Sequence, residues 1–105
     1  MKPSKGDWKL FQESLSEYRE SYLAERNKTF IAILNDEKRT PTEQFWDTYN
    51  AMKKQEKILR DCLDGFSKSD MTIRILLMLR YGLMKEEDLD AYSDELREWV
   101  LNARR

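Results

Sequence analysis

Large apolar side chains recur along two long stretches of this chain with the three- and four-residue spacing of one helix face. The first set is Trp8, Phe11, Leu15, Tyr18 and Tyr22, continued after a one-residue shift by Leu23, Phe30, Ile33 and Leu34. The second set, interrupted by a glutamate, is Phe45, Tyr49, Met52, Leu59, Leu63 and Phe66. Because only about six polar residues join the two sets, we expect two long helices that pack as an antiparallel hairpin over residues 7–66.

The boundaries of these helices are marked by residues with clear capping preferences. Thr40 suits the N-cap of the second helix, Pro41 its first position and Glu43 its third, which together form a capping box. The polar segment 35–39 before it should end the first helix. Gly65 is expected to adopt the left-handed conformation that follows a last helical turn.

The remaining residues, 67–105, predict a small helical head. Ser69 or Asp70 can begin a compact helix that Gly82 ends, and Ser93 can cap a last helix running to about residue 103. The alternation over residues 71–75 also fits a strand, but the sequence offers no second strand to pair with it. We therefore predict an all-α protein: a disordered leader (1–6) and one domain (7–105) made of the hairpin and a head of two to three short helices.

Composition excludes several classes of function. The 105 residues carry 19 basic and 20 acidic side chains, and this net charge of −1 argues against nucleic-acid binding. The chain has no histidine, which removes the usual nucleophile–base pairs and most zinc and di-iron sites. We therefore expect no catalytic residue, no metal and no cofactor.

The expected location is the cytoplasm. Cys62 has no second cysteine to pair with and has apolar neighbours, which fits a buried thiol in a reducing compartment. No secretory apolar region follows Met1, and the longest apolar run, residues 75–79, is too short to span a bilayer.

Three groups of residues are candidates for a protein interface. They are the aromatic side chains Trp8, Phe45, Trp46, Tyr49 and Trp99, the basic stripe Lys53, Lys57 and Arg60, and the acidic pair Glu86 and Glu87. Each group also has a structural interpretation: aromatic residues fill cores, lysines cover the solvated back of a helix, and carboxylates favour first helical turns. Glu56 could be a buried acid, a register-setting residue, or the partner of a cation across the hairpin.

Several short motifs resemble the fluorescence recovery proteins of cyanobacteria. Trp8 near the start of the first helix, Trp46 at the start of the second, and the segment 82–89 (Gly-Leu-Met-Lys-Glu-Glu-Asp-Leu) are similar to features of that family. The resemblance implies a dimer formed through a two-helix stalk, and a regulator that detaches and relaxes a light-activated carotenoid protein. Asn50 departs from the pattern, because the family has a functional aspartate there.

Taken together, the sequence predicts a small non-enzymatic interaction protein, a homodimeric adaptor or regulator that acts on an unidentified protein partner through aromatic and charged helix faces. The alternatives are a fluorescence-recovery-type regulator, and a phage or mobile-element protein that binds DNA or a host factor. We expect neither membrane nor nucleic acid among its partners.

Overall fold

The computed structural model describes residues 3–65 and 67–104, and over these residues all regular structure is helical. The elements, in chain order, are α1 (Lys5–Leu34), α2 (Pro41–Cys62), η1 (Lys68–Asp70), α3 (Met71–Arg80), η2 (Glu86–Ala91) and α4 (Asp94–Arg104). The all-α prediction is thus confirmed for the described part of the chain, and the segment 71–75, which also fitted a strand, is helical.

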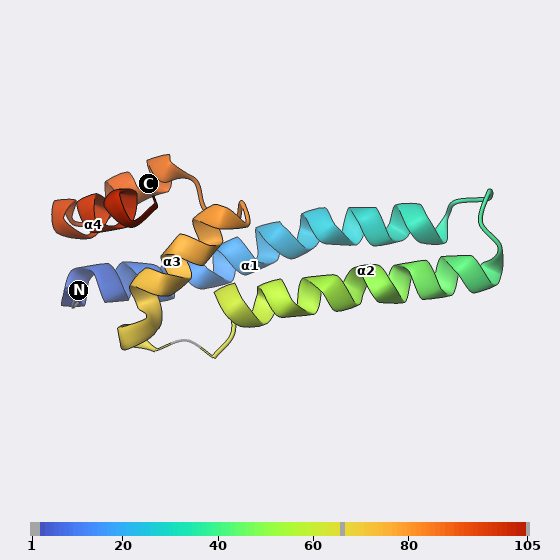
Figure 1. The fold of residues 1–105 in the computed structure, drawn as a ribbon, viewed down its shortest axis with the longest axis horizontal. Coiled ribbons are helices and arrows are strands. Elements are labelled where there is room, and N and C mark those ends of the chain that lie inside the picture. The colour runs from blue at the N-terminus through green and yellow to red at the C-terminus, as the bar shows by residue number, and fades with distance from the viewer. Residues whose placement is uncertain (1–2, 66, 105) are drawn as a thin grey trace.

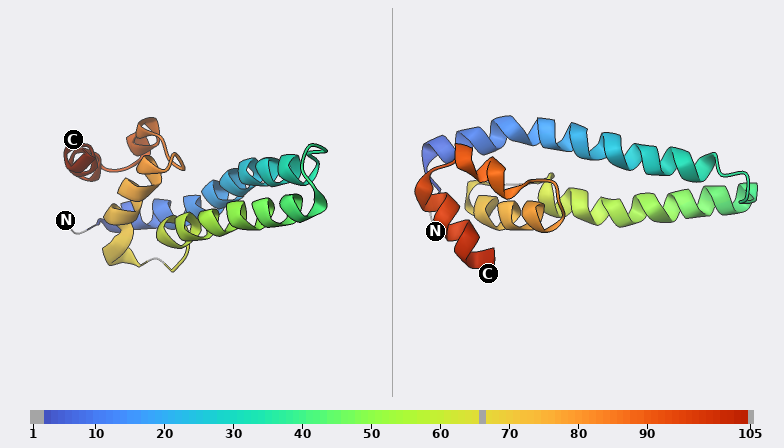
Figure 2. Two further views of the ribbon diagram at one scale, coloured as in Figure 1. Left: turned by 45° about the vertical axis from the view of Figure 1, so that its right-hand side comes forward. Right: turned by 90° about the horizontal axis from the view of Figure 1, so that it is seen from above.

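Helices α1 and α2 run side by side in opposite directions, and α3, η2 and α4 gather around the N-terminal half of α1 (Figure 1). The two further views show the same elongated shape, with one end formed only by the α1–α2 connection (Figure 2). The extents are 52 × 25 × 19 Å. We call the α1–α2 connection and the adjoining helix ends the tip, and the opposite end the head.

Helix α1 begins earlier than its sequence pattern predicts. Ser4 is the N-cap, and its side chain accepts a hydrogen bond from the backbone N–H of Asp7 at 3.1 Å. Lys5 and Gly6 are therefore helical, which corrects the expectation of a disordered leader over 1–6; residues 1–2 lie outside the described residues.

The predicted capping box of α2 is confirmed. Thr40 Oγ1 accepts from the backbone N–H of Glu43 at 3.2 Å, and the Glu43 carboxylate accepts from the N–H of Thr40 at 2.9 Å. These hydrogen bonds stabilise the charged form of Glu43 and lower the pKa of its carboxyl group. At the other end of α2, Gly65 has a φ of +61°, the left-handed conformation expected of it.

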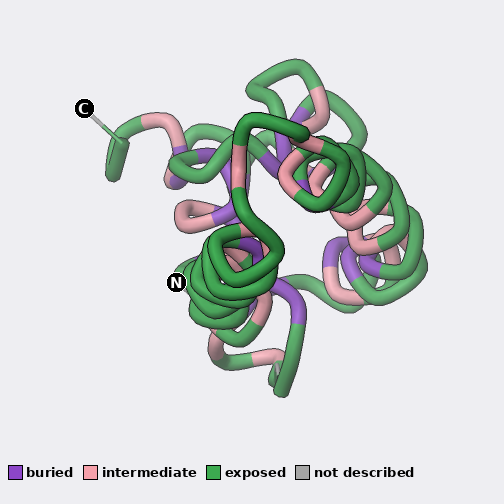
Figure 3. Tube along the Cα trace, turned by 90° about the vertical axis from the view of Figure 1, so that its right-hand side faces the viewer, coloured by how far each residue is buried: buried purple, intermediate pink, exposed green. Residues whose placement is uncertain are grey.

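The core lies in the head. Its fully buried side chains come from the start of α1, the end of α2, and from α3, η2 and α4: Phe11, Cys62, Leu63, Met71, Ile75, Met78, Leu89, Leu96 and Val100. Seen from the tip, the nearer part of the hairpin is mostly exposed (Figure 3). In that half only Phe30 and Thr48 are buried, so the hairpin extends beyond the core that anchors it.

Candidate protein-binding surface

The apolar stripe of α2 does not face α1 near the tip. Phe45, Tyr49 and Met52, predicted to line the hairpin seam, are between 48% and 60% exposed. The seam is formed by residues one position earlier, including the buried Thr48 and half-buried Ala51. The predicted register of α2 is therefore wrong by about one residue in this half, and Phe66 lies outside the described residues.

This shift turns the apolar stripe of α2 to one side of the hairpin. Two aliphatic residues of α1 lie on the same side. Ile31 and Leu34 are about half exposed, and each directly follows a seam residue of α1, as Tyr49 and Met52 do on α2. In two antiparallel helices, the positions that follow the seam residues point to the same side of the pair. The exposed apolar residues of α1 and α2 thus form one surface.

We call this surface the tip face, and it consists of Ile31, Leu34, Phe45, Trp46, Tyr49 and Met52. Its aromatic rings contact one another edge to face. The ring centroids of Phe45 and Trp46 are 5.0 Å apart, and those of Trp46 and Tyr49 are 5.7 Å apart. Aromatic pairs of this geometry are favourable beyond the area they bury, so the face has a defined shape.

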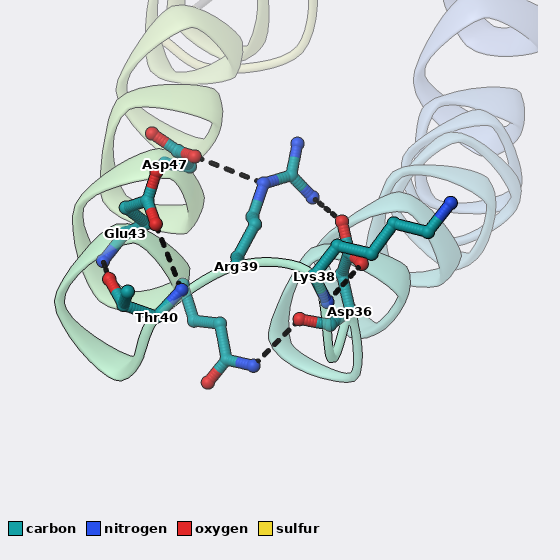
Figure 4. Close-up of polar contacts among 7 residues, drawn as sticks. Asp36, Lys38, Arg39, Thr40, Glu43 and Asp47 are labelled. Atoms are coloured by element: carbon teal, nitrogen blue, oxygen red, sulfur yellow. Dashed lines mark hydrogen bonds and ion pairs between the residues drawn. The ribbon is translucent and has the colours of Figure 1, made fainter.

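The connection at the tip is fixed by charged hydrogen bonds (Figure 4). The Arg39 guanidinium donates to the carboxylates of Asp36 at 3.0 Å and Asp47 at 3.1 Å, bridging the connection to α2. Gln44 Nε2 donates to the backbone carbonyl of Asp36 at 3.0 Å. These contacts hold the ends of α1 and α2 together, so the tip face is presented on ordered helices.

The seam behind the tip face mixes apolar residues such as Phe30 with polar ones. The Tyr22 hydroxyl hydrogen-bonds to the Gln55 side chain, and the Arg26 guanidinium lies 5.4 Å from the centre of the Tyr22 ring. Arg26 Nε and Thr48 Oγ1 are buried without a hydrogen-bond partner among the described residues. Because buried polar atoms without partners are costly, this seam holds the hairpin less firmly than an apolar seam of the same length would.

The basic stripe is brought next to the aromatic residues, but one member is already neutralised. Lys53 and Lys57 are exposed, whereas Arg60 donates to the Glu56 carboxylate at 3.0 Å. Glu56 is therefore neither buried nor paired across the hairpin; it forms an i,i+4 ion pair on its own helix. A surface hollow of about 570 Å³ lies beside the stripe, lined by Asn50, Lys53, Lys54 and Lys57.

The other predicted interface residues lie in the head, away from the tip face. Trp8 and Trp99 are half-buried against the core, as the structural interpretation of these residues required. Glu86 is ion-paired with Arg104, and Glu87 is exposed in the first turn of η2. Of the predicted set, the structure thus joins only Phe45, Trp46 and Tyr49 on one surface, with the lysines beside it.

Ile31, Leu34 and Met52 are not among the predicted interface residues, and Leu34 and Met52 belong to the apolar sets predicted to line the seam, which is wrong for both. A signal for Met52 is present in the sequence. Glu56 interrupts the apolar stripe of α2, and a charged residue on that stripe indicates that this side of the helix is reached by water. For Ile31 and Leu34 the sequence gives no comparable sign.

The chemistry that the described residues can offer is limited. They contain no group of three or more His, Cys, Asp or Glu side chains placed to hold a metal ion. Burial raises the pKa of the Cys62 thiol to about 11, which makes it a poor nucleophile at neutral pH. No helix within the described residues is long and apolar enough to span a bilayer.

Neither protein families, nor curated proteins, nor solved structures yield a match to this chain. The resemblance to fluorescence recovery proteins therefore stays a prediction that rests on the quoted motifs alone.

Proposed function

We propose that this protein is a small non-enzymatic interaction module, a homodimeric adaptor or regulator that associates through the tip face. The observation that carries the proposal is the size of that face. Six side chains that are each about half exposed present roughly 600 Å² of apolar surface, at the upper end of what monomeric proteins expose. Apolar surfaces of this size mark protein–protein contacts.

A second copy of the chain suits this face because of symmetry. In a two-fold dimer the same patch meets itself, so any charge at its centre lies near an identical charge. The six residues of the tip face are all uncharged at neutral pH. Two such faces would bury about 1,200 Å² in total, which reaches the lower end of specific interfaces.

Near the tip, the hairpin has almost no apolar core of its own. A further layer of helices would provide one. Two helices alone cannot enclose apolar side chains, whereas four helices surround a shared core. Pairing two tip faces would place Phe45, Tyr49 and Met52 inside such a four-helix arrangement. The register of α2, which turns its apolar stripe away from α1, is then favourable in the assembled protein.

The absence of catalysis and the cytoplasmic setting are part of the same proposal. The chain has no histidine, and its single thiol is buried with a raised pKa. A protein of this composition is better suited to binding than to proton transfer or nucleophilic attack. A lone buried cysteine also suits a reducing compartment.

Light scattering coupled to size exclusion tests the proposal at micromolar concentration. We expect wild-type protein at about twice the monomer mass of 12.7 kDa, and the double variant Phe45→Ser/Tyr49→Ser at the monomer mass. These substitutions remove apolar area that is exposed in the monomer, so the helical circular dichroism of the variant should be retained.

Ile73→Ser is the matched control, because Ile73 is an exposed apolar residue on α3, outside the tip face. This variant should remain dimeric. A monomeric wild-type protein, or a dimer that persists in the tip-face double variant, would overturn the proposal.

A further inference from the structure

Beside the tip face, α2 carries lysines whose charge nothing in the described structure neutralises. Lys53, Lys54 and Lys57 form no ion pair with any residue in 3–65 or 67–104. Of the acidic residues near them on α2, Asp47 is paired with Arg39 and Glu56 with Arg60, whereas Asp61, four residues after Lys57, forms no ion pair among the described residues. The cluster therefore keeps three positive charges within about one helical turn.

This arrangement is unfavourable for an isolated helix. Lys53 and Lys57 are four residues apart, and Lys54 and Lys57 three, so both pairs are like-charged neighbours on the helix surface. Several acidic residues without ion pairs, such as Glu87, Asp94 and Glu95, lie in the head, away from the lysines. An anionic group beside the lysines would convert the repulsion into attraction.

The surface around the lysines is shallowly hollowed and widely open to solvent. The 570 Å³ hollow has lysine side chains as walls, so its sides are methylene groups and its rim is cationic. A second hollow, of about 400 Å³, lies between α1 and α2 and shares Asn50 and Lys54 with the first. Arg26 lines it, a cation that is held over the Tyr22 ring and forms no ion pair among the described residues. We call the two hollows together the basic groove.

An aromatic anchor lies in line with this groove. Trp46 precedes Asn50, Lys53 and Lys57 by four, seven and eleven residues, so all four lie on one side of α2. Trp46 is half exposed at the border between the tip face and the basic groove. A ligand that follows this side of the helix meets first an apolar ring and then a row of ammonium groups.

We propose that the basic groove docks a carboxylate-rich amphipathic helix of a partner protein. Carboxylates three or four residues apart on such a helix are spaced like the lysines of α2, and an apolar residue near its end can pack on Trp46. The lysines and the two hollows lie outside the tip face, and the two surfaces share only Trp46 at their border.

A nucleic acid fits the same charges less well. A phosphate backbone extends beyond a short groove, and at the head of this 52 Å molecule it would meet Glu87, Asp94 and Glu95. A helix of limited length avoids the acidic head.

Fluorescence anisotropy with a labelled synthetic peptide tests the proposal. The probe is a helix of about 18 residues, roughly 27 Å long, with Glu at every third or fourth position between Leu and Ala. We expect binding that weakens as salt rises, and a loss of about tenfold in Lys53→Gln/Lys54→Gln/Lys57→Gln, since each exposed ion pair contributes a few-fold. The matched control is Lys5→Gln/Lys9→Gln/Lys28→Gln, which removes the same charge elsewhere and should bind like wild type.

Other outcomes of these measurements would contradict the proposal or assign the groove to a different ligand. Equal binding by the two triple variants, or no binding of the peptide at low salt, would overturn the proposal. Tighter binding of a single- or double-stranded DNA oligonucleotide than of the peptide would assign the groove to nucleic acid instead. If the lysine variant becomes monomeric in light scattering, the groove is part of the dimer contact; loss of the dimer in the tip-face variant alone leaves the two surfaces separate.

Discussion

At the scale of single residues, Asp7 joins two segments that are 86 residues apart in the sequence. Its buried carboxylate accepts from the backbone N–H of Ser93 at 2.8 Å and from the Ser93 hydroxyl at 2.6 Å. Ser93 Oγ in turn accepts from the N–H of Leu96 at 3.2 Å, as expected of the N-cap of α4. One carboxylate therefore fixes the first turn of α1 against the last helix.

Asp7→Asn should destabilise the protein measurably. The amide keeps the shape of the side chain but loses one of the two charged acceptors, so we expect a loss of about 1–3 kcal/mol in the free energy of unfolding. Urea denaturation followed by circular dichroism measures it. Asp94→Asn, at an exposed position in α4, is the control and should change stability by less than about 0.5 kcal/mol. Similar losses in both variants would argue against the role of Asp7.

At the scale of elements, the end of α2 is held by arginines from two other helices. Arg74 of α3 donates through one Nη atom to the carbonyls of Arg60, Asp61 and Asp64 at 2.8–3.0 Å, and through the other to Gly65 at 3.0 Å. Arg19 of α1 donates to the carbonyl of Leu63 at 2.6 Å. Positive side chains at a helix C-terminus satisfy unpaired carbonyls and interact favourably with the helix dipole.

Arg74→Lys should therefore not behave as a conservative change. A lysine has one ammonium group and cannot reach four carbonyls with the planar geometry of a guanidinium, so we expect a loss of about 2 kcal/mol of stability. Thermal unfolding monitored by circular dichroism would register a lower midpoint. Arg80→Lys, at an exposed position on the same helix, should leave the midpoint unchanged; an unchanged midpoint for Arg74→Lys would refute the assigned role.

Features that depend on nearby residues could be predicted from the sequence, whereas features that depend on distant packing could not. The Thr40–Glu43 capping box, Ser93 as a cap and Gly65 as a helix end depend on neighbours within a few residues, so local patterns identify them. The register of α2 depends on what covers each side of the helix, and spacing alone does not say this. The same limit applies to Asp7, since nothing near it in sequence indicates a partner 86 residues away.

At the scale of the whole molecule, packing is uneven, and stability should be uneven as well. The apolar core lies in the head, whereas the half of the hairpin near the tip has a partly polar seam and few buried residues. Regions with few buried contacts open locally at a lower free energy than the core does. Association through the tip face would offset this difference by covering the exposed side chains.

Hydrogen exchange read by mass spectrometry should reveal both effects. In dilute protein we expect backbone amides of residues 26–34 and 44–54 to exchange faster than those of 71–79. Raising the protein concentration should slow exchange in the tip segments and leave the head unchanged, because binding stabilises the state that binds. In Phe45→Ser/Tyr49→Ser this dependence on concentration should disappear. Equal protection of tip and head in dilute protein would contradict the uneven packing.

The separation between tip face and core has an evolutionary consequence. About 20 Å of α2 lies between Phe45 and the first residues that reach the core, such as Leu59. Substitutions at the tip can therefore alter which surfaces meet without changing the contacts that fold the head. Descendants of this chain could lose, strengthen or exchange a binding preference in single steps while the folded domain is inherited intact.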